Sequence, residues 1–378
     1  RLQARAQLTL DQEDERVTDR PDGPADTLGA FASRRRVDVG RRRAELRLHY
    51  RPGPGTVITA GAEAENEDLV SRSAFTSGFG STADSVDAAR DATGYFAEVV
   101  ARPGAWSLSA GARVDESEAF GTFATVRAGA GYTLPTGTRL RASAGNSFKE
   151  PTFTETVGSA LVVGNPGLEP ERTRSWEVGV EQELWGDRAS VAVTWFDQAF
   201  RDLVQFTVAP GDSLAAGLTP APNFFNVAEA ASRGLEVEAE ARLPAGLSVR
   251  ANYSRLDTEV VDAGFQGEPG ETFETGEELL RRPAHTGNVV LAWRPPSGGS
   301  VRASVGWVGE RDDIVFTGLS GRRTVLDGYT RVDLALRHPV PGLRAAVGVD
   351  VTPTLRVDNL LDADYQEVAG FDAPGRTV

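Results

Sequence analysis

The stretch Leu235–Leu243 (LEVEAEARL) places apolar side chains at odd positions and charged side chains at even positions. Successive side chains of a β-strand point to opposite faces, so this period of two predicts a strand with one apolar face and one charged face. The same alternation recurs throughout the chain, in Leu2–Leu10, Ala44–Tyr50, Ser190–Trp195, Val301–Trp307 and Arg331–Arg337. No comparable stretch keeps a helical period, so we expect an all-β protein.

About fifteen strands are expected, joined alternately by short turns and long loops. The short turns are Pro52–Gly55, Pro103–Gly104, Pro135–Gly137, Trp185–Asp187, Pro244–Gly246, Pro295–Gly299 and Pro339–Gly342. The long loops are Asp11–Gly40, Glu67–Thr93, Phe148–Thr173, Gln198–Ser232, Asp257–Arg281, Glu310–Asp327 and Leu360–Gly375, with a shorter member at Asp115–Gly121. Short periplasmic turns and long extracellular loops are typical of outer-membrane barrels.

The predicted fold is therefore a transmembrane antiparallel β-barrel, with apolar faces toward lipid and charged faces around a wide lumen. The alternative is a soluble antiparallel sheet, in which the apolar face packs against a core. An open sheet of this many strands would leave exposed edges, whereas closure removes them and satisfies the backbone within the membrane. Exposed tryptophans are expected at the two membrane interfaces.

The composition of the 378 residues excludes several classes of protein. No apolar run approaches the ~20 residues of a membrane-spanning helix. The formal charge of -14 argues against a nucleic-acid partner, and the absence of cysteine excludes disulfides and thiolate sites. The absence of methionine favours an internal fragment of a longer protein. His49, His285 and His338 lack metal-binding spacing, and no nucleophile elbow, Walker loop or dinucleotide fingerprint occurs. We therefore expect no metal site, no cofactor and no enzymatic activity.

Several motifs are more specific than the alternation. Residues 146–155 (NSFKEPTFTE) are followed by Gly164–Thr173 (GNPGLEPERT) and then by Trp176–Gly179 (WEVG). Further along, Asn226–Glu236 and Arg356–Tyr365 complete a series whose order and spacing resemble those of TonB-dependent outer-membrane receptors. The positions that match the family motifs are Pro151, Asn165, Pro166, Pro170, Glu171, Glu177, Asn359 and Tyr365. As turn-forming and strand-starting residues, they are expected to shape loops.

The resemblance implies that residues 1–378 are one domain, part of a 22-stranded barrel whose N-terminal plug and last strand lie outside this chain. An open seam with unpaired edges is then expected. The implied location is the bacterial outer membrane. The implied function is active import of a scarce nutrient, with a ferric siderophore as cargo and the TonB–ExbB–ExbD complex as the energy source acting through the plug. The alternatives are a cobalamin receptor of the same family, a passive porin, an adhesin-type barrel, and a secreted soluble β-protein.

Substrate residues are expected in the long loops, because the family captures its ligand there together with the plug. Aromatic residues would contact the apolar part of a metal chelate or vitamin, and basic residues would meet an anionic siderophore. These candidates are Phe75, Phe79, Phe224, Phe225, Phe265, Phe273, Phe316, Arg322 and Arg323. Packing within the loops is the alternative role for each of them.

Overall fold

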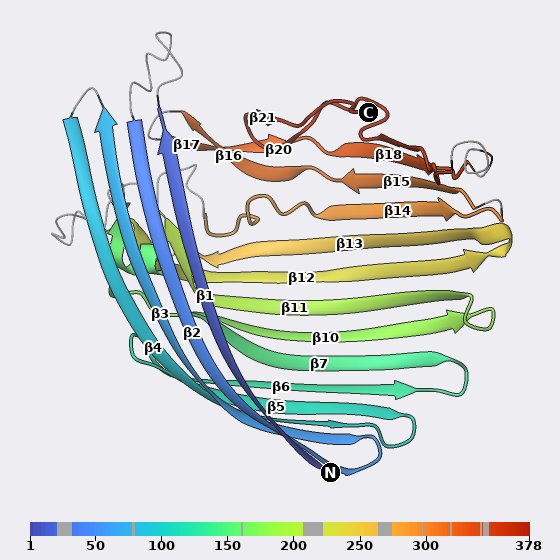
Figure 1. The fold of residues 1–378 in the computed structure, drawn as a ribbon, viewed down its shortest axis with the longest axis horizontal. Helices are drawn as coiled ribbons and strands as arrows, with labels where there is room; N and C mark the ends of the chain where they lie inside the picture. The colour runs from blue at the N-terminus through green and yellow to red at the C-terminus, as the bar shows by residue number, and fades with distance from the viewer. Residues whose placement is uncertain are drawn as a thin grey trace. The chain divides into compact units, whose positions relative to one another are not determined.

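The computed structural model describes the chain except for residues 21–31, 78–79, 160–161, 207–221, 264–273, 297, 318–319, 341 and 343–347. Its described part contains one antiparallel sheet of 15 strands, shown in Figure 1. In sheet order these are β1 (Leu2–Asp19), β2 (Ala32–Gly53), β3 (Thr56–Ser77), β4 (Gly80–Ala101), β5 (Trp106–Ser117), β6 (Gly121–Thr133), β7 (Thr138–Lys149), β10 (Glu171–Leu184), β11 (Ala189–Phe206), β12 (Phe224–Leu243), β13 (Leu247–Asp262), β14 (His285–Trp293), β15 (Ser300–Val308), β18 (Tyr329–Arg337) and β19 (Thr354–Val357).

The remaining elements are short. They are helix α1 (Phe153–Val157), the 3-10 turn η1 (Pro244–Gly246), and three two-stranded sheets formed by β8 (Gly158–Ser159) with β9 (Val162–Val163), β16 (Arg311–Thr317) with β17 (Ser320–Leu326), and β20 (Gln366–Val368) with β21 (Phe371–Asp372). In the described part of the chain, no helix is long and apolar enough to cross a membrane.

The residues group into two compact units. The first unit comprises Arg1–Ala130, Ala144–Arg174 and Phe200–Glu229, and thus contains β1 to β5 and the α1 segment. The second unit comprises Gly131–Ser143, Ser175–Ala199 and Ala230–Val378. β6, β7, β10, β11 and β12 contribute residues to both units.

In the first unit the usual burial pattern of a soluble sheet is inverted. Leu46, Leu48 and Tyr50 are 50%, 40% and 48% exposed. On the opposite face of the same sheet, the side chains of Glu63 and Glu65 are only 13% and 14% exposed. A soluble sheet buries its apolar face, whereas a barrel in lipid exposes it. The sheet therefore has the arrangement predicted for a transmembrane barrel.

The second unit repeats this inversion on β10. Trp176, Val178 and Val180 are exposed, at 44%, 45% and 39%, while Glu177 and Glu181 on the opposite face of the strand are half-buried. The tryptophans expected at the membrane interfaces are also exposed; in the two units these are Trp106, Trp185, Trp195, Trp293 and Trp307. Trp185 lies in the turn between β10 and β11.

Most of the predicted short turns are confirmed. Five of them join β2 to β3, β4 to β5, β6 to β7, β10 to β11 and β12 to β13. Glycine supplies the left-handed backbone in several of these turns, as at Gly55 (φ 75) and Gly137 (φ 78), where a side chain would be strained. β18 ends at Arg337 and β19 begins at Thr354, and the predicted turn at Pro339–Gly342 between them lies partly outside the described residues.

Three of the predicted long loops were wrong. β1 and β2 pair through Asp19 and Ser33, and β3 and β4 pair through Ser77 and Gly80, so Asp11–Gly40 and Glu67–Thr93 are largely strand. Glu310–Asp327 contains the β16–β17 hairpin. These segments lack the apolar alternation of the other strands, but strands that extend into water satisfy their backbone hydrogen bonds in the sheet ladder and need no apolar face.

Candidate functional site

The candidate ligand residues do not all lie in loops. Phe75 is in β3, Phe224 and Phe225 begin β12, Phe316 is in β16, and Arg322 and Arg323 are in β17. Phe79, Phe265 and Phe273 lie outside the described residues. In the first unit, Phe224 packs edge-on against Phe206 of β11, with ring centroids 5.4 Å apart. This aromatic pair lies where β11 ends and β12 begins.

The segment between β7 and β10 is fastened to β11 and β12 by asparagine side chains, which we call the asparagine clasp (Asn165, Asn223 and Asn226). Asn165 Nδ2 donates to the carbonyl oxygen of Phe224 over 2.8 Å. Asn223 Oδ1 accepts from the amide of Val163 over 2.8 Å. These bonds join residues about sixty positions apart, and each connects an asparagine side chain to a backbone group of the other segment.

Asn226 forms the centre of the clasp. Its Nδ2 donates to the carbonyl oxygens of Glu169 and Asp202, both over 2.7 Å, and its Oδ1 accepts from the Glu169 amide over 2.7 Å. The family-motif residue Glu171 lies beside it and accepts from the Val204 amide (3.0 Å) and from Lys149 Nζ (3.1 Å). The clasp therefore holds three segments in one fixed arrangement.

We predict that Asn226→Ala loosens this outer segment without unfolding the sheet. Three hydrogen bonds of about 1 kcal/mol each would be lost, so amides of residues 162–171 should exchange with solvent about ten- to a hundredfold faster. Hydrogen–deuterium exchange on the purified protein measures this. Asn288→Ala is the control, because Asn288 is an exposed strand residue for which the described residues give no side-chain hydrogen bond. Equal exchange in both variants would contradict the role of the clasp.

Arg90 of β4 anchors the other end of the same segment. Its guanidinium donates to the carbonyl oxygen of Pro151 (2.8 Å), pairs with Glu67 (2.7 Å), and lies 4.7 Å from the ring centroid of Phe153. Pro151 is fully buried, and Thr152 with Glu155 forms a capping box that starts α1. Sequence reasoning identified Pro151 but missed Arg90, which no motif marks.

Charged side chains on one face of β2 to β5 form a continuous set of ion pairs. We call this surface the ionic wall; its residues are Arg41, Arg43, Arg47, Glu63, Glu65, Phe96, Arg113 and Asp115. Glu65 accepts from both Arg41 and Arg43 over 2.6 Å. Arg113 pairs with Glu63 (3.1 Å) and Asp115 (2.6 Å). The ring of Phe96 lies between Arg47 (5.3 Å) and Arg113 (5.8 Å), beside a cavity of about 360 Å³. The wall suits a wide, polar interior.

In the second unit, the buried carboxylate of Asp313 organises the β16–β17 hairpin. Its side chain is 0% exposed, and it accepts from Arg281 Nε (2.7 Å) and from the amides of Ile314 (2.8 Å) and Ala369 (2.7 Å). Burial by itself would raise the pKa of Asp313, but the two amides and Arg281 outweigh it and lower the pKa below its ordinary value of 3.8. The carboxylate is thus held in its charged form.

The two candidate arginines differ in their surroundings. Arg323 is 15% exposed, pairs with Asp312 over 2.6 Å and donates to the carbonyl oxygen of Glu278. Arg322 is exposed. The hairpin therefore already uses Arg323 for its own packing, whereas the Arg322 side chain faces solvent.

The motif residues of the second unit shape the chain after β19. Asn359 is 2% exposed and adopts φ 52, a left-handed conformation that asparagine tolerates, while its amide oxygen and nitrogen bond to Ala363 at 2.9 Å. Tyr365 stacks on Tyr329 with centroids 4.0 Å apart.

Glu177 of β10 accepts from Ser143 over 3.1 Å. In the first unit Pro170 is buried and Pro166 is exposed.

A family model described as "TonB dependent receptor-like, beta-barrel" matches residues 2–360. The chain is similar in fold to the ferripyoverdine receptor of the outer membrane of Pseudomonas aeruginosa, solved bound to ferripyoverdine, with 16% identity and a TM-score of 0.72. That match covers 99% of this chain and 53% of the receptor.

Two further solved structures are also similar to this chain in fold. The siderophore receptor PiuA from Acinetobacter baumannii is 15% identical, with a TM-score of 0.70, over 99% of this chain and 60% of its own. The copper transporter OprC is 16% identical, with a TM-score of 0.74, over 99% of this chain and 63% of its own. The chain therefore spans between about half and less than two thirds of the proteins it matches.

Proposed function

The chain belongs to the TonB-dependent receptor β-barrel family of the bacterial outer membrane, and from this premise we propose that the whole protein imports a ferric siderophore. Binding occurs at the extracellular ends of the strands, and the TonB–ExbB–ExbD complex supplies the energy through a plug domain. Residues 1–378 serve as one barrel portion that provides wall and rim. The protein acts as a receptor and catalyses no reaction.

The observation that carries this proposal is the asparagine clasp. It fixes the segment between β7 and β10 against β11 and β12 and so presents a preorganised surface beside Phe206 and Phe224. Preorganisation lowers the entropic cost of binding, which a high-affinity receptor requires and a passive pore does not. The clasp therefore favours a receptor over a porin.

The ligand chemistry of the chain favours an organic chelate over a bare metal ion as cargo. Soft metals such as Cu(I) prefer cysteine and methionine, and the sequence contains neither, with only three histidines. In the described residues, no group of three or more His, Asp or Glu side chains could hold a metal ion. A ferric siderophore brings its own ligands and needs from the protein only aromatic and basic contacts.

Uptake measurements test this function. The full-length receptor containing this chain is expressed in cells without other siderophore receptors, and radiolabelled ferric chelates of the catecholate, hydroxamate and carboxylate classes are offered separately. We expect saturable uptake of one class that is lost when TonB is deleted. Cobalamin and a copper salt are the competing cargoes. Non-saturable uptake that persists without TonB would indicate a porin instead.

A further inference from the structure

The ionic wall presents mainly guanidinium groups to the side away from lipid. The side chain of Arg41 is 42% exposed, and that of its partner Glu65 is 14% exposed. Arg47 is 40% exposed, against 17% for its partner Glu45 on the same strand. The arginine is likewise the more exposed partner in the other pairs of the wall, Arg43 with Glu65, and Arg113 with Glu63 and Asp115. The carboxylates therefore lie close to the strands, and the guanidinium groups lie farther out, toward the lumen.

This layering gives the surface a preference for anions. An arginine carries more N–H donors than one carboxylate can occupy. Glu45, for example, accepts from Arg47 Nη2 over 3.0 Å and lies 2.8 Å from Arg47 Nε. The remaining donors of the arginine can bind a second anion. The carboxylates, in contrast, are largely covered and offer little surface to a cation.

A row of residues directly across four strands lies at the centre of this surface. Arg47, Gly61, Phe96 and Arg113 are opposite one another on β2, β3, β4 and β5. The Phe96 ring lies between the two guanidinium groups, which would otherwise repel each other. A Cβ atom on Gly61 would overlap this ring, so the glycine makes room for it. The row thus holds two cations on either side of an aromatic ring.

The cavity of about 360 Å³ beside Phe96 contains a third guanidinium group. Arg127 of β6 lines it, is 73% exposed and pairs with Glu98 over 2.5 Å. We call this hollow the wall cavity; the residues used here are Arg47, Phe96, Arg113 and Arg127. Its volume lies at the lower end of the range of about 300–1,000 Å³ that is usual for small-molecule sites.

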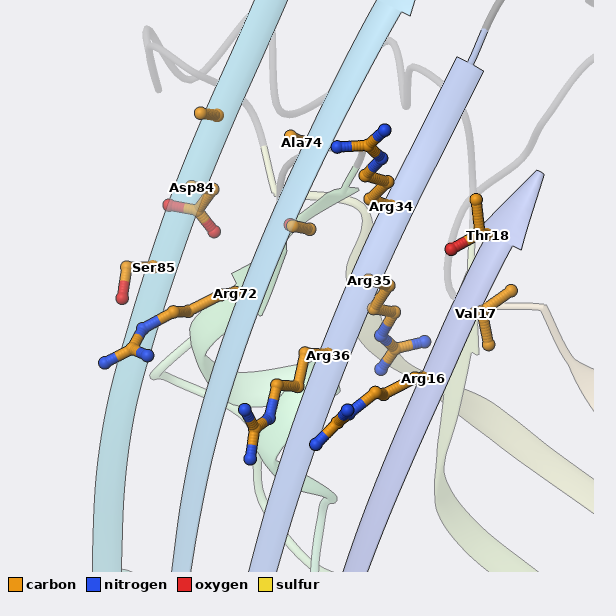
Figure 2. A pocket seen from close by; sticks show the side chains of 12 residues that line it. Arg16, Val17, Thr18, Arg34, Arg35, Arg36, Arg72, Ala74, Asp84 and Ser85 are labelled. Carbon is orange, nitrogen blue, oxygen red and sulfur yellow. The ribbon is translucent and has the colours of Figure 1, made fainter. Parts of the chain in front are cut away.

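The wall cavity lies at the height of the membrane, on the lumen side. Arg47 stands between Leu46 and Leu48 on β2, whose side chains are exposed on the lipid face. The pairing of β2 with both neighbours is continuous from Arg35 to Arg47, so the odd-numbered residues share one face. Figure 2 shows Arg35 and Arg36 leaving β2 on opposite sides. Arginines therefore follow the lumen side over roughly 40 Å of strand, from Arg35 in the extracellular extension to Arg47.

We propose that the wall cavity is a passage site for an anionic ferric chelate on its way through the lumen. The chelate leaves the extracellular binding site and engages Arg47, Arg113 and Arg127 at membrane height. A site on a transport path must bind weakly enough to release its cargo. The carboxylates of the ion pairs meet this need, because they compete with the chelate for the same guanidinium groups.

This inference rests on the proposed import function and narrows its cargo. Catecholate groups are dianionic and leave a net negative charge around Fe(III), and carboxylate chelates such as ferric citrate are also anionic. Hydroxamate groups are monoanionic and form a neutral ferric chelate. The guanidinium-lined wall cavity therefore favours the first two classes over the third.

The test separates binding from passage in the full-length receptor, expressed in cells without other siderophore receptors. The probes are a radiolabelled ferric catecholate, ferric citrate and a neutral ferric hydroxamate. Binding is measured in cells without TonB, and the saturated rate of uptake is measured in cells with TonB. The variant is Arg47→Gln/Arg127→Gln. The control is Arg36→Gln/Arg42→Gln, which removes two arginines from the opposite face of β2.

We expect the wild type to import one of the two anionic probes. The cavity variant should bind that probe with an unchanged Kd and import it about tenfold more slowly, because two charge-assisted contacts on the path are lost. The control should match the wild type in both measurements. Heat-dependent migration on gels and the amount of receptor at the cell surface confirm that each variant is folded.

Four outcomes would overturn the inference and leave TonB-coupled import standing. These are import of the neutral hydroxamate alone, equal uptake rates in the cavity variant and the control, a raised Kd with an unchanged saturated rate, and slower uptake accompanied by entry of a large antibiotic. The third outcome would assign the arginines to the extracellular binding site, and the fourth would assign them to contact with the plug. Uptake that persists without TonB would instead contradict the proposed function itself.

Discussion

Leu48→Arg is expected to cost about 2–4 kcal/mol of folding free energy in a bilayer, the typical penalty for an arginine facing lipid near the midplane of a barrel. Leu48 is 40% exposed, and its row across the sheet contains Ala4, Ala60 and Ala97, none of which can pair with a charge. Urea titration of the full-length protein refolded into phospholipid vesicles, followed by tryptophan fluorescence, measures the loss.

The neighbouring substitution His49→Arg is the control for Leu48→Arg. His49 is on the charged face, where its ring contacts Thr59 Oγ1 over 3.0 Å, and a second cation there joins an existing set of ion pairs. We expect a loss of at most about 1 kcal/mol, corresponding to that one hydrogen bond. If the two variants were equally destabilised, the assignment of the Leu48 face to lipid would be wrong.

Asp313→Ala is expected to open the β16–β17 hairpin. The substitution leaves the buried amide of Ile314 and the half-buried amide of Ala369 without their acceptor, at about 1–3 kcal/mol each. The ion pair itself adds little, because the Arg281 side chain is 44% exposed and can turn to water. A local loss of about 2–5 kcal/mol follows, and hydrogen exchange of the hairpin amides measures it. Asp327→Ala, at an exposed position next to the hairpin, should leave exchange unchanged.

The same carboxylate gives the hairpin a defined pH dependence. The pKa of Asp313 is lower in the folded protein than its ordinary value of 3.8, so the charged form stabilises the fold. This contribution is fully present above about that value and is lost as the pH falls through the lower, folded pKa. The free energy of hairpin opening should therefore stay constant from neutral pH down to about pH 4. A decline already near neutral pH would show that another group controls the hairpin.

The period of two was sufficient to predict the sheet, because alternation directly encodes which side chains share a face. Leu46 and Leu48 were assigned to lipid from their spacing alone, and their exposure agrees. The same reasoning underestimated the length of β1 to β4, which continue as strands beyond the membrane. Residues such as Arg35 and Asp84 fell within predicted long loops, although the ladder hydrogen bonds that hold them in strands are independent of side-chain type.

The candidate site was harder to predict, because its contacts join residues distant in sequence. Asn226 belonged to a recognised motif, but its bonds to Glu169 and Asp202 depend on the pairing of three separate segments. Arg90 carries no local signal at all, and its role appears only when Pro151 is placed beside β4. The ligand roles of Phe75, Phe224, Phe225, Phe316 and Arg322 remain predictions, since folding alone does not reveal a ligand.

The ion pair between Lys149 and Glu171 has a practical consequence. Lys149 is the only lysine in the chain, its side chain is 58% exposed, and it lies at the end of β7 beside the asparagine clasp. Within residues 1–378, an amine-reactive fluorophore therefore attaches to a single side chain, at the end of β7. On the purified protein, its emission would report changes around the Lys149–Glu171 ion pair without the introduction of a cysteine.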